Sequence, residues 1–197
     1  MKKPKKSFAA LLMYSIIALS AVVAAICLVA YYGGFQTATW ILWSGIVAFM
    51  IMYHLWVRII MGNVSKLFGI QYESRWFSEK KFEKKLYKFL RVKKWKGKVL
   101  TYNPELFDVE NHTLGEIANT MAKAETDHWI NEVISLSSLL FSLIWGEFWI
   151  FALTAFAAII FDAQFIVVQR YNRPRVLRIL SKAEKRRENF ECTNQNR

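Results

Sequence analysis

Long apolar runs dominate the pattern of hydrophobic and polar positions along the chain. Each main run is close to the ~20 residues that an α-helix needs to cross ~30 Å of hydrocarbon. These runs cover residues 8–32, 40–61, 128–145 and 148–169. The pattern therefore predicts an all-α fold, an integral membrane bundle of four transmembrane helices.

A lysine-rich segment between the second and third runs has apolar residues at helical spacing. Residues 79–96 are predicted to form an amphipathic helix with lysines around its polar side. Its apolar face consists of Phe82, Leu86, Phe89 and Leu90. Ser78 is placed to cap the helix, and Phe77 and Phe82 are spaced as a hydrophobic staple. Such a helix suits the surface of an anionic bilayer.

Two further signals mark helix boundaries. The sequence "TLGE", from Thr113 to Glu116, is a capping box and predicts a helix that continues into the third run. After the fourth run, Asn172 and Pro174 predict that the helix breaks and restarts. The restarted helix, over residues 174–188, would have a second amphipathic face. We expect the chain to form a single membrane domain, with these amphipathic helices on its cytoplasmic side.

Basic residues follow the boundaries of the apolar runs. Of the 27 lysines and arginines, thirteen lie in residues 62–127 and nine in residues 170–197, and the others apart from Arg58 precede the first run. The remaining connections, "YGGFQTAT" and "GE", contain none. By the positive-inside rule, both termini and the long central segment face the cytoplasm, as in a multi-pass protein of the cell membrane. This distribution argues against nucleic acid as a partner, although the net charge is +12.

The composition agrees with a membrane protein. Hydrophobic residues make up 54% of the chain, a share that soluble domains seldom reach. The two cysteines, Cys27 and Cys192, cannot form a framework of disulfide bonds. The chain has three histidines and no CxxC motif, which excludes a zinc finger. Candidate chemistry must therefore come from the polar residues within and beside the apolar runs.

Placing an ionisable residue inside a membrane span costs free energy unless the residue is paired or hydrated, so such residues are candidates for function. One face of the third predicted helix carries Glu125, His128 and Glu132, at i, i+3 and i+7. One face of the second carries His54 and Arg58, at i, i+4. The last candidate, Asp162, lies in the fourth run. At about 1.5 Å of rise per residue, His54 and Asp162 lie at similar depths. We predict one polar cavity open to the cytoplasm; the alternative is a set of scattered structural ion pairs.

The segment "VVQRYNRPRVLRIL" concentrates arginines immediately after the fourth run. Its four arginines lie within residues 167–180. They could anchor the protein to anionic lipid, which is worth about 1 kcal/mol per basic residue near the surface. Anchoring alone needs no tyrosine, asparagine or proline between the charges. The sequence therefore favours a site that binds an anionic group.

Three motifs together resemble one family of membrane enzymes. The strings "RVKKWKGKVL", "AETDHW" and "VVQRYNRPR" have the order and approximate spacing of the glycosyl-4,4'-diaponeurosporenoate acyltransferase family. The resemblance covers about residues 84–180. It implies an enzyme that esterifies a fatty acyl chain onto the sugar of a glycosylated carotenoid. The broader expectation is an O-acyltransferase whose acceptor is a glycosylated lipid or terpenoid.

Acyl transfer to a hydroxyl needs a base, a hydrogen-bond donor for the oxyanion and a site for the activated acyl donor. His128 is the expected base, and Glu125, one turn away, is placed to orient it. Arg58 or Asn172 is the expected oxyanion contact, and His54 is a further catalytic candidate. No Ser or Cys lies in a nucleophile-elbow motif, so we expect direct transfer without an acyl-enzyme.

The basic motifs are expected to bind the donor, either acyl-CoA or an acidic acyl carrier protein. Arginine forks match phosphate oxygens, and a helix restarting at Pro174 would add its N-terminal amides. The expected substrate-binding residues are Arg170, Tyr171, Asn172, Arg173, Arg175, Lys94, Trp95, Lys96, Asp162 and Glu132. The other expected partners are the lipid or glycolipid acceptor and membrane lipids, and no cofactor is expected.

Two other functions stay open on the sequence. His54, Glu125, His128 and Asp162 could supply nitrogen and oxygen ligands to zinc or iron in a metal-dependent intramembrane enzyme. The basic helices could instead recruit anionic lipid or a partner, as in a non-enzymatic lipid-binding or assembly protein. The loss of an acylated product in a His128→Ala variant of normal abundance and location would exclude this last function.

Overall fold

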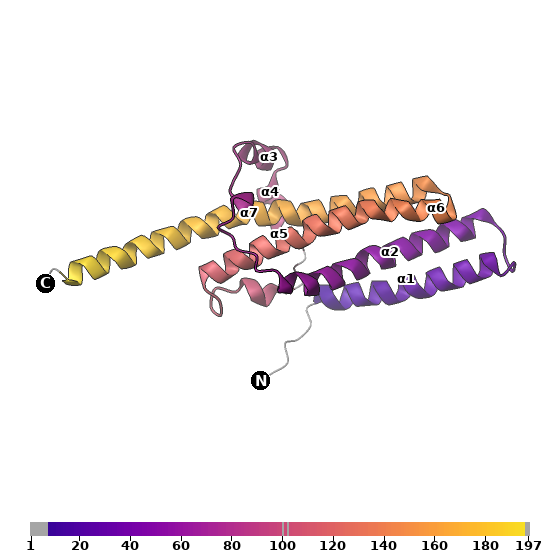
Figure 1. Cartoon of the computed structure of the whole chain (residues 1–197), viewed down its shortest axis with the longest axis horizontal. Coiled ribbons are helices and arrows are strands. Elements are labelled where there is room, and N and C mark those ends of the chain that lie inside the picture. Colours follow the sequence, from indigo (N-terminus) through magenta and orange to yellow (C-terminus); the bar gives the residue numbers. More distant parts are fainter. Residues whose placement is uncertain (1–7, 100, 102, 196–197) are drawn as a thin grey trace, which may run out of the picture. The chain divides into compact units, whose positions relative to one another are not determined.

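The structure is a computed structural model that describes residues 8–99, 101 and 103–195, and these residues form helices and turns without a β-strand (Figure 1). The α-helices are α1 (Phe8–Tyr32), α2 (Thr39–Val64), α3 (Glu83–Phe89), α4 (Val92–Trp95), α5 (Leu114–Ser137), α6 (Ser142–Trp145) and α7 (Phe148–Gln195). The 3-10 helices are η1 (Ser65–Leu67), η2 (Arg75–Phe77), η3 (Lys96–Lys98), η4 (Pro104–Phe107) and η5 (Ser138–Phe141). The all-α prediction is confirmed. The N-terminal lysines lie outside the described residues.

The chain forms two compact units. The first, here called the apolar unit, comprises Met1–Phe68, Leu100–Tyr102 and Asp127–Gln164. The second, here called the basic unit, comprises Gly69–Val99, Asn103–Thr126 and Phe165–Arg197. Helices α5 and α7 each contribute one part to each unit.

Three helices of the described chain are long and apolar enough to cross a membrane. They are α1, α2 and α7, whose most apolar stretches have mean hydropathies of 2.6, 1.7 and 2.1. They contain the first, second and fourth of the predicted spans. The chain is therefore a membrane protein with three clear candidate spans, and the prediction of four is confirmed only in part.

The third predicted span, residues 128–145, is not a continuous α-helix. It begins within α5, passes through η5 and ends with α6. Ser137, Ser138 and Ser142 donate hydrogen bonds of 2.7, 2.6 and 2.7 Å to carbonyls three residues back. Hydroxyls that bond back to the preceding turn compete with regular α-helical pairing. The local sequence thus explains why this segment departs from a uniform helix.

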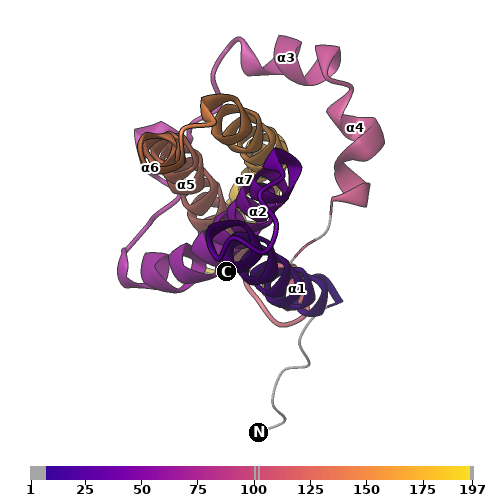
Figure 2. The ribbon, with the colours of Figure 1, turned by 90° about the vertical axis from the view of Figure 1, so that its right-hand side faces the viewer.

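Close packing in the apolar unit joins α1 to α2, which lie side by side (Figure 2). An added Cβ at Gly45 would lie 3.0 Å from the Leu28 side chain and 3.1 Å from that of Cys27. The absence of a side chain at Gly45 therefore lets the two helices approach. The apolar core beside this contact consists of Leu42, Ile46, Met50 and Phe151. Aromatic side chains from α2, η5 and α6 surround it.

In the basic unit, the predicted helix over residues 79–96 is divided into short pieces. Arg91, with φ of 50°, lies in the left-handed region and separates α3 from α4. The Ser78 hydroxyl donates to the Arg75 carbonyl at 2.7 Å instead of capping α3. Phe77 is buried whereas Phe82 is 63% exposed. The predicted cap and hydrophobic staple are therefore wrong: α3 begins after Phe82, and the Phe77 ring lies under the Arg173 guanidinium at 4.8 Å.

Helix α7 continues through Pro174, so the predicted break and restart are wrong. The φ of proline suits an α-helix, but its ring removes one backbone hydrogen bond, at a cost of about 3 kcal/mol in a helix interior. The flanking Arg170 and Arg173 side chains make buried ion pairs, which hold the helix on the N-terminal side of Pro174. The Arg175 guanidinium donates to the Tyr171 carbonyl on the other side. Tertiary contacts thus override the local signal.

The capping box at the start of α5 is confirmed. The Glu116 amide donates to Thr113 Oγ1 at 3.2 Å, and the Thr113 amide donates to Glu116 Oε2 at 2.8 Å. The backbone and hydroxyl hydrogen bonds from Thr113 lower the pKa of the Glu116 carboxyl. Reciprocal bonds of this kind satisfy amides that have no partner within the helix.

Candidate functional site

Asp162 is the centre of a polar cluster in the apolar unit. It lies on α7, and none of its side chain is exposed. Arg58 of α2 binds it through two nitrogens: Nε donates to Oδ1 at 3.2 Å, and Nη2 donates to Oδ2. Nδ1 of His128, on α5, lies 2.7 Å from Oδ1. The structure thus brings together three side chains that the sequence predicted would meet.

The contact with Asp162 fixes the chemical form of His128. An ionised carboxylate only accepts hydrogen bonds, so Nδ1 of His128 carries the hydrogen. In the neutral ring Nε2 is then the proton acceptor. The His128 side chain is 19% exposed, whereas Asp162 is fully buried. His128 is therefore the exposed member of the pair, and Asp162 holds its ring from the buried side.

His54 adds a second imidazole to the apolar unit. It is buried one turn before Arg58, and its backbone carbonyl accepts a hydrogen bond from that guanidinium. Its Nδ1 lies 3.3 Å from the Ser135 hydroxyl oxygen on α5. Its Nε2 is buried and has no partner among the described residues. A buried polar atom without a partner costs about 1–3 kcal/mol, so Nε2 is a candidate for contact with a substrate.

The remaining candidates of this unit have different positions. Glu132 is half-buried on α5, and no hydrogen bond to its side chain is found within the described part of the chain. Arg58 donates to Asp162, to the His54 carbonyl and to the Ala158 carbonyl. Its donors are therefore committed to acceptors of the protein. Arg58 is better suited to holding Asp162 than to contacting an oxyanion.

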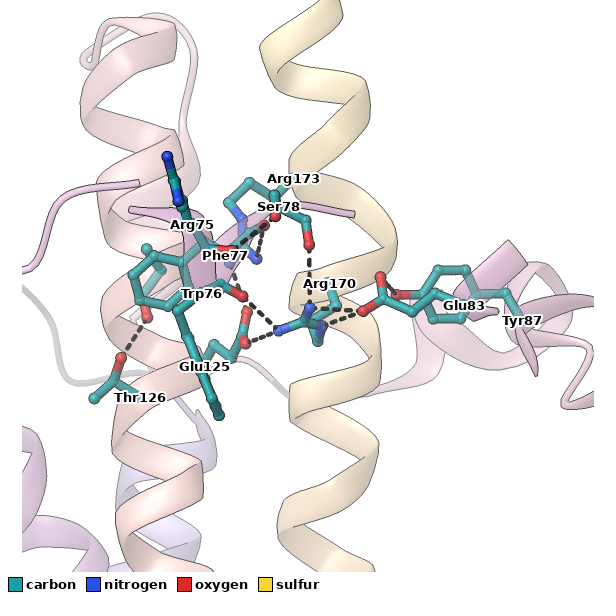
Figure 3. Close-up of polar contacts among 11 residues, drawn as sticks. Arg75, Trp76, Phe77, Ser78, Glu83, Tyr87, Glu125, Thr126, Arg170 and Arg173 are labelled. Carbon is teal, nitrogen blue, oxygen red and sulfur yellow. Dashed lines mark hydrogen bonds and ion pairs between the residues drawn. The ribbon is translucent and has the colours of Figure 1, made fainter. Parts of the chain in front are cut away.

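The basic unit contains a buried network of two glutamates and two arginines (Figure 3). Glu125 of α5 accepts from Nη1 of Arg170 at 2.5 Å and from Nη1 of Arg173 at 2.6 Å. Arg170 also donates to Glu83 of α3 through Nε at 2.9 Å and Nη2 at 2.6 Å. Nη2 of Arg173 donates to the Phe77 carbonyl at 2.8 Å. These contacts connect α3, η2, α5 and α7.

The network changes the roles expected for three residues. Both carboxylate oxygens of Glu125 are bound by arginines, and the carboxylate that contacts His128 is Asp162. Arg170 and Arg173 are engaged inside the protein rather than presented to a phosphate. Breaking a buried pair of this kind typically costs about 3–5 kcal/mol, because one charge is left uncompensated. These contacts favour a structural role for the three residues.

Glu83 and Tyr87 complete the network, and the sequence analysis missed both. They are buried at i, i+4 on α3, and the Tyr87 hydroxyl donates to Glu83 Oε2 at 2.9 Å. Burial and this hydrogen bond raise the pKa of Tyr87. The i, i+4 spacing was the available signal, but these two residues lie on a different side of the helix from the apolar face that the sequence predicted for a bilayer surface. That face, which includes Phe82 and Phe89, is exposed, as a membrane-facing surface would be.

A strongly basic pocket lies beside this network, in the same unit. Its volume is about 560 Å³. The basic residues that line it are Lys84, Lys88, Arg91, Lys93, Lys94, Arg175 and Arg178. Tyr87, Tyr171 and Pro174 contribute to its wall, and Glu79 is its acidic member. Of the predicted donor-binding residues, the pocket thus includes Lys94, Tyr171 and Arg175.

The other predicted donor-binding residues support one wall of the pocket. Lys96 donates to Asn172 Oδ1 at 2.8 Å, and its Nζ lies 5.1 Å from the centre of the Tyr171 ring. Burial and the nearby Arg175 lower the pKa of Lys96. Trp95 donates through Nε1 to the Leu90 carbonyl at 2.9 Å. The Lys96 contacts hold η3 against α7, whereas the Trp95 bond is local to the turn between α3 and α4.

A family model described as glycosyl-4,4'-diaponeurosporenoate acyltransferase (CrtO) matches residues 73–182. The chain belongs to this family. The match to the CrtO family makes the chain an acyltransferase and confirms the resemblance carried by the three motifs. No curated protein matches the chain, and no solved structure matches it.

The CrtO match contains His128, Asp162 and the whole glutamate–arginine network, whereas α1 and α2 both precede it. His54 and Arg58 therefore lie outside the matched region. Within the described residues, no three His, Cys, Asp or Glu side chains form a group that could hold a metal ion. The set proposed for a metal-dependent enzyme, which included His54 and Glu125, thus does not form a ligand group.

Proposed function

We propose that the protein transfers a fatty acyl group from an activated donor, acyl-CoA or an acyl carrier protein, to a hydroxyl of a glycosylated lipid or terpenoid. The family description supports a glycosylated carotenoid as the acceptor. The observation that carries the proposal is the His128–Asp162 pair, in which a buried carboxylate orients a partly exposed imidazole. The His–carboxylate pair is a common arrangement for activating a hydroxyl.

In the proposed reaction, Nε2 of His128 accepts the proton of the acceptor hydroxyl as its oxygen attacks the acyl carbonyl carbon. The bond between that oxygen and the carbonyl carbon forms, and the bond between the carbon and the donor's sulfur breaks. The imidazolium then returns the proton to the departing thiolate, so the ester and the free thiol are the products. Asp162 acts as a positioning residue, because it holds the Nδ1 hydrogen and keeps Nε2 directed toward the substrate.

His54 is proposed to contact the oxyanion of this reaction. If the Ser135 hydroxyl donates to Nδ1 of His54, the neutral ring carries its hydrogen on Nε2. That atom is buried and has no partner among the described residues. A donor that is already desolvated needs little reorganisation when negative charge develops nearby. This role replaces the oxyanion contact expected of Arg58 or Asn172.

The charge distribution supports a location in the cell membrane with both termini in the cytoplasm. All basic residues but Arg58 lie before α1, in residues 62–127 or in residues 170–197. The connection between α1 and α2 and the one between α6 and α7 contain no lysine or arginine. The positive-inside rule assigns these two connections to the opposite side.

The proposal is tested by comparing extracted lipids from cells that contain His128→Gln with those from cells that contain the parent protein. We expect the amount of the acylated product to decrease by a factor of about 10²–10⁴. The unacylated acceptor should accumulate in its place. Protein abundance and membrane location should be unchanged, because Asp162 keeps its ion pair with Arg58. The matched control is His112→Gln, which changes a histidine 33% exposed beside the capping box. An unchanged acylated product in His128→Gln would contradict the proposal.

A further inference from the structure

We infer that the basic pocket of the basic unit binds the phosphate groups of coenzyme A, so that the acyl donor is an acyl-CoA thioester. This inference rests on the proposed function and specifies its donor. It concerns the nucleotide end of the donor only. The pocket is formed by α3, α4, the turn at Arg91 and one face of α7.

Helical spacing divides the arginines of α7 between two tasks. Tyr171, Pro174, Arg175 and Arg178 line the pocket, and their i, i+3, i+4, i+7 spacing places them on one face of α7. Arg170 and Arg173, at i, i+3, point instead to Glu125 (Figure 3). The continuous helix through Pro174 maintains this division. The motif "RYNRPR" therefore both stabilises the unit and supplies cations to the pocket.

Most of the cations in the pocket have no carboxylate to neutralise them. Glu79 lies 3.9 Å from Lys84 and 3.5 Å from Arg178, and both basic side chains are about two-thirds exposed. Within the described residues, the other basic members of the pocket make no ion pair with a carboxylate. These members are Lys88, Arg91, Lys93, Lys94 and Arg175. Such an unbalanced group of cations favours a ligand with several negative charges.

The aromatic wall keeps one of these cations in place. The Arg175 guanidinium lies 3.6 Å from the centre of the Tyr171 ring, and Tyr171 packs edge-on against Tyr87 at 5.4 Å. Tyr87 is in turn hydrogen-bonded to Glu83, which is bound by Arg170. A guanidinium fixed on an aromatic face loses less conformational freedom when it binds phosphate. The buried network thus supports the pocket mechanically.

Coenzyme A matches this pocket better than the alternatives. It carries a pyrophosphate and a 3′-phosphate, with a total of about four negative charges, whereas a carrier-bound phosphopantetheine or a simple lipid headgroup has a single phosphodiester. The volume of about 560 Å³ lies in the range of small-molecule and cofactor sites. A carrier protein would instead dock its acidic surface on an open face of the enzyme. The concave shape and the number of unpaired cations therefore favour the free nucleotide.

The inference is tested by equilibrium binding of CoA to the purified full-length protein in nanodiscs of phosphatidylcholine. We expect affinity to fall in the order CoA, 3′-dephospho-CoA and 4′-phosphopantetheine, and to decrease with increasing salt. The double substitution Lys88→Gln/Lys94→Gln removes two lining cations and should weaken CoA binding about tenfold or more. The matched control, Lys80→Gln/Lys85→Gln, removes two exposed lysines that do not line the pocket and should leave binding within about twofold.

The possible results distinguish a failure of the coenzyme A inference from a failure of the proposed catalytic role of His128. Equal affinity for CoA and 4′-phosphopantetheine, or equal binding by the two double variants, would overturn the inference. Loss of CoA binding in nanodiscs that contain phosphatidylglycerol would overturn it in favour of a lipid headgroup. Acyl transfer from acyl carrier protein without measurable CoA binding would overturn it and leave the acyltransferase intact. Pocket-dependent CoA binding combined with an unchanged acyl product in His128→Gln would support the pocket and refute the proposed base.

Discussion

At the scale of single residues, one buried carboxylate serves two partners in each unit. Asp162 is shared by Arg58 and His128, and Glu125 is shared by Arg170 and Arg173. The two carboxylates have different roles because Asp162 has an imidazole among its partners and Glu125 has only guanidinium groups. His128 is partly exposed and is the proposed base, so Asp162 combines a structural role with the proposed chemical one. Both partners of Glu125 are arginines, which favours a structural role for it.

Arg58 allows these two roles of Asp162 to be separated. Arg58→Gln leaves Asp162 buried beside an uncharged partner, which should reduce the free energy of unfolding by about 3–5 kcal/mol. His128→Gln keeps the ion pair and should change that free energy by less than about 1 kcal/mol. Thermal unfolding of the purified variants in detergent measures both effects. Equal stability of the two variants would show that the Arg58–Asp162 pair contributes nothing to folding.

Glu125→Gln tests the network of the basic unit. The substitution leaves two buried arginines facing an amide, and we expect a loss of stability of about 3–5 kcal/mol. Glu105→Gln, which changes an exposed residue of η4, is the control and should be within about 0.5 kcal/mol of the parent protein. The measurement is the melting temperature, with protein abundance in the membrane as a second readout. If Glu125→Gln has the same melting temperature as the parent protein, the network is not a major source of stability.

At the scale of helices, the features that depend on residues close together in the sequence were predictable. The lengths of α1 and α2 follow from their apolar runs, and the Thr113–Glu116 capping box marks the start of α5. His54 and Asp162 were predicted to lie at similar depths, and Asp162 binds Arg58, which lies one turn after His54. The failures occur where distant contacts decide the structure. The burial of Glu83 depends on Arg170, which lies 87 residues later, and no local pattern carries that information.

Pro174 is the clearest conflict between a local signal and the observed helix. Replacement by alanine restores one backbone hydrogen bond in α7, partly offset by greater freedom of the unfolded chain. We expect Pro174→Ala to stabilise the protein by about 2 kcal/mol and to increase the protection of neighbouring amides in hydrogen exchange. Pro104→Ala is the control, because proline is favoured where it stands, in the first turn of η4. A decrease in stability and amide protection in Pro174→Ala would indicate that α7 is interrupted at this residue.

At the scale of the whole molecule, the number of membrane crossings connects the charge pattern to the fold. Termini on the same side require an even number of crossings, whereas three helices meet the criteria of length and composition. Residues 128–145 supply the candidate for the fourth. Ser135 lies beside His54, and further along the chain Trp145 packs against Phe49 with ring centres 5.2 Å apart. This segment therefore runs antiparallel to α2 within the apolar unit, despite its irregular helical geometry.

We accordingly predict that residues 128–145 cross the membrane and that both termini are cytoplasmic. Exposed Cys192 reports the position of the C-terminal end of α7. In a Cys27→Ser background, a membrane-impermeant maleimide should label Cys192 only after the cells are permeabilised. A reporter fused to the N-terminus should give the same result, and a cysteine placed at Gly146 should be labelled in intact cells. Labelling of Cys192 without permeabilisation, together with a cytoplasmic N-terminus, would mean an odd number of crossings. Residues 128–145 would then be on one side of the bilayer, and the ion pairs of Asp162 would have to form without a fourth membrane-spanning segment.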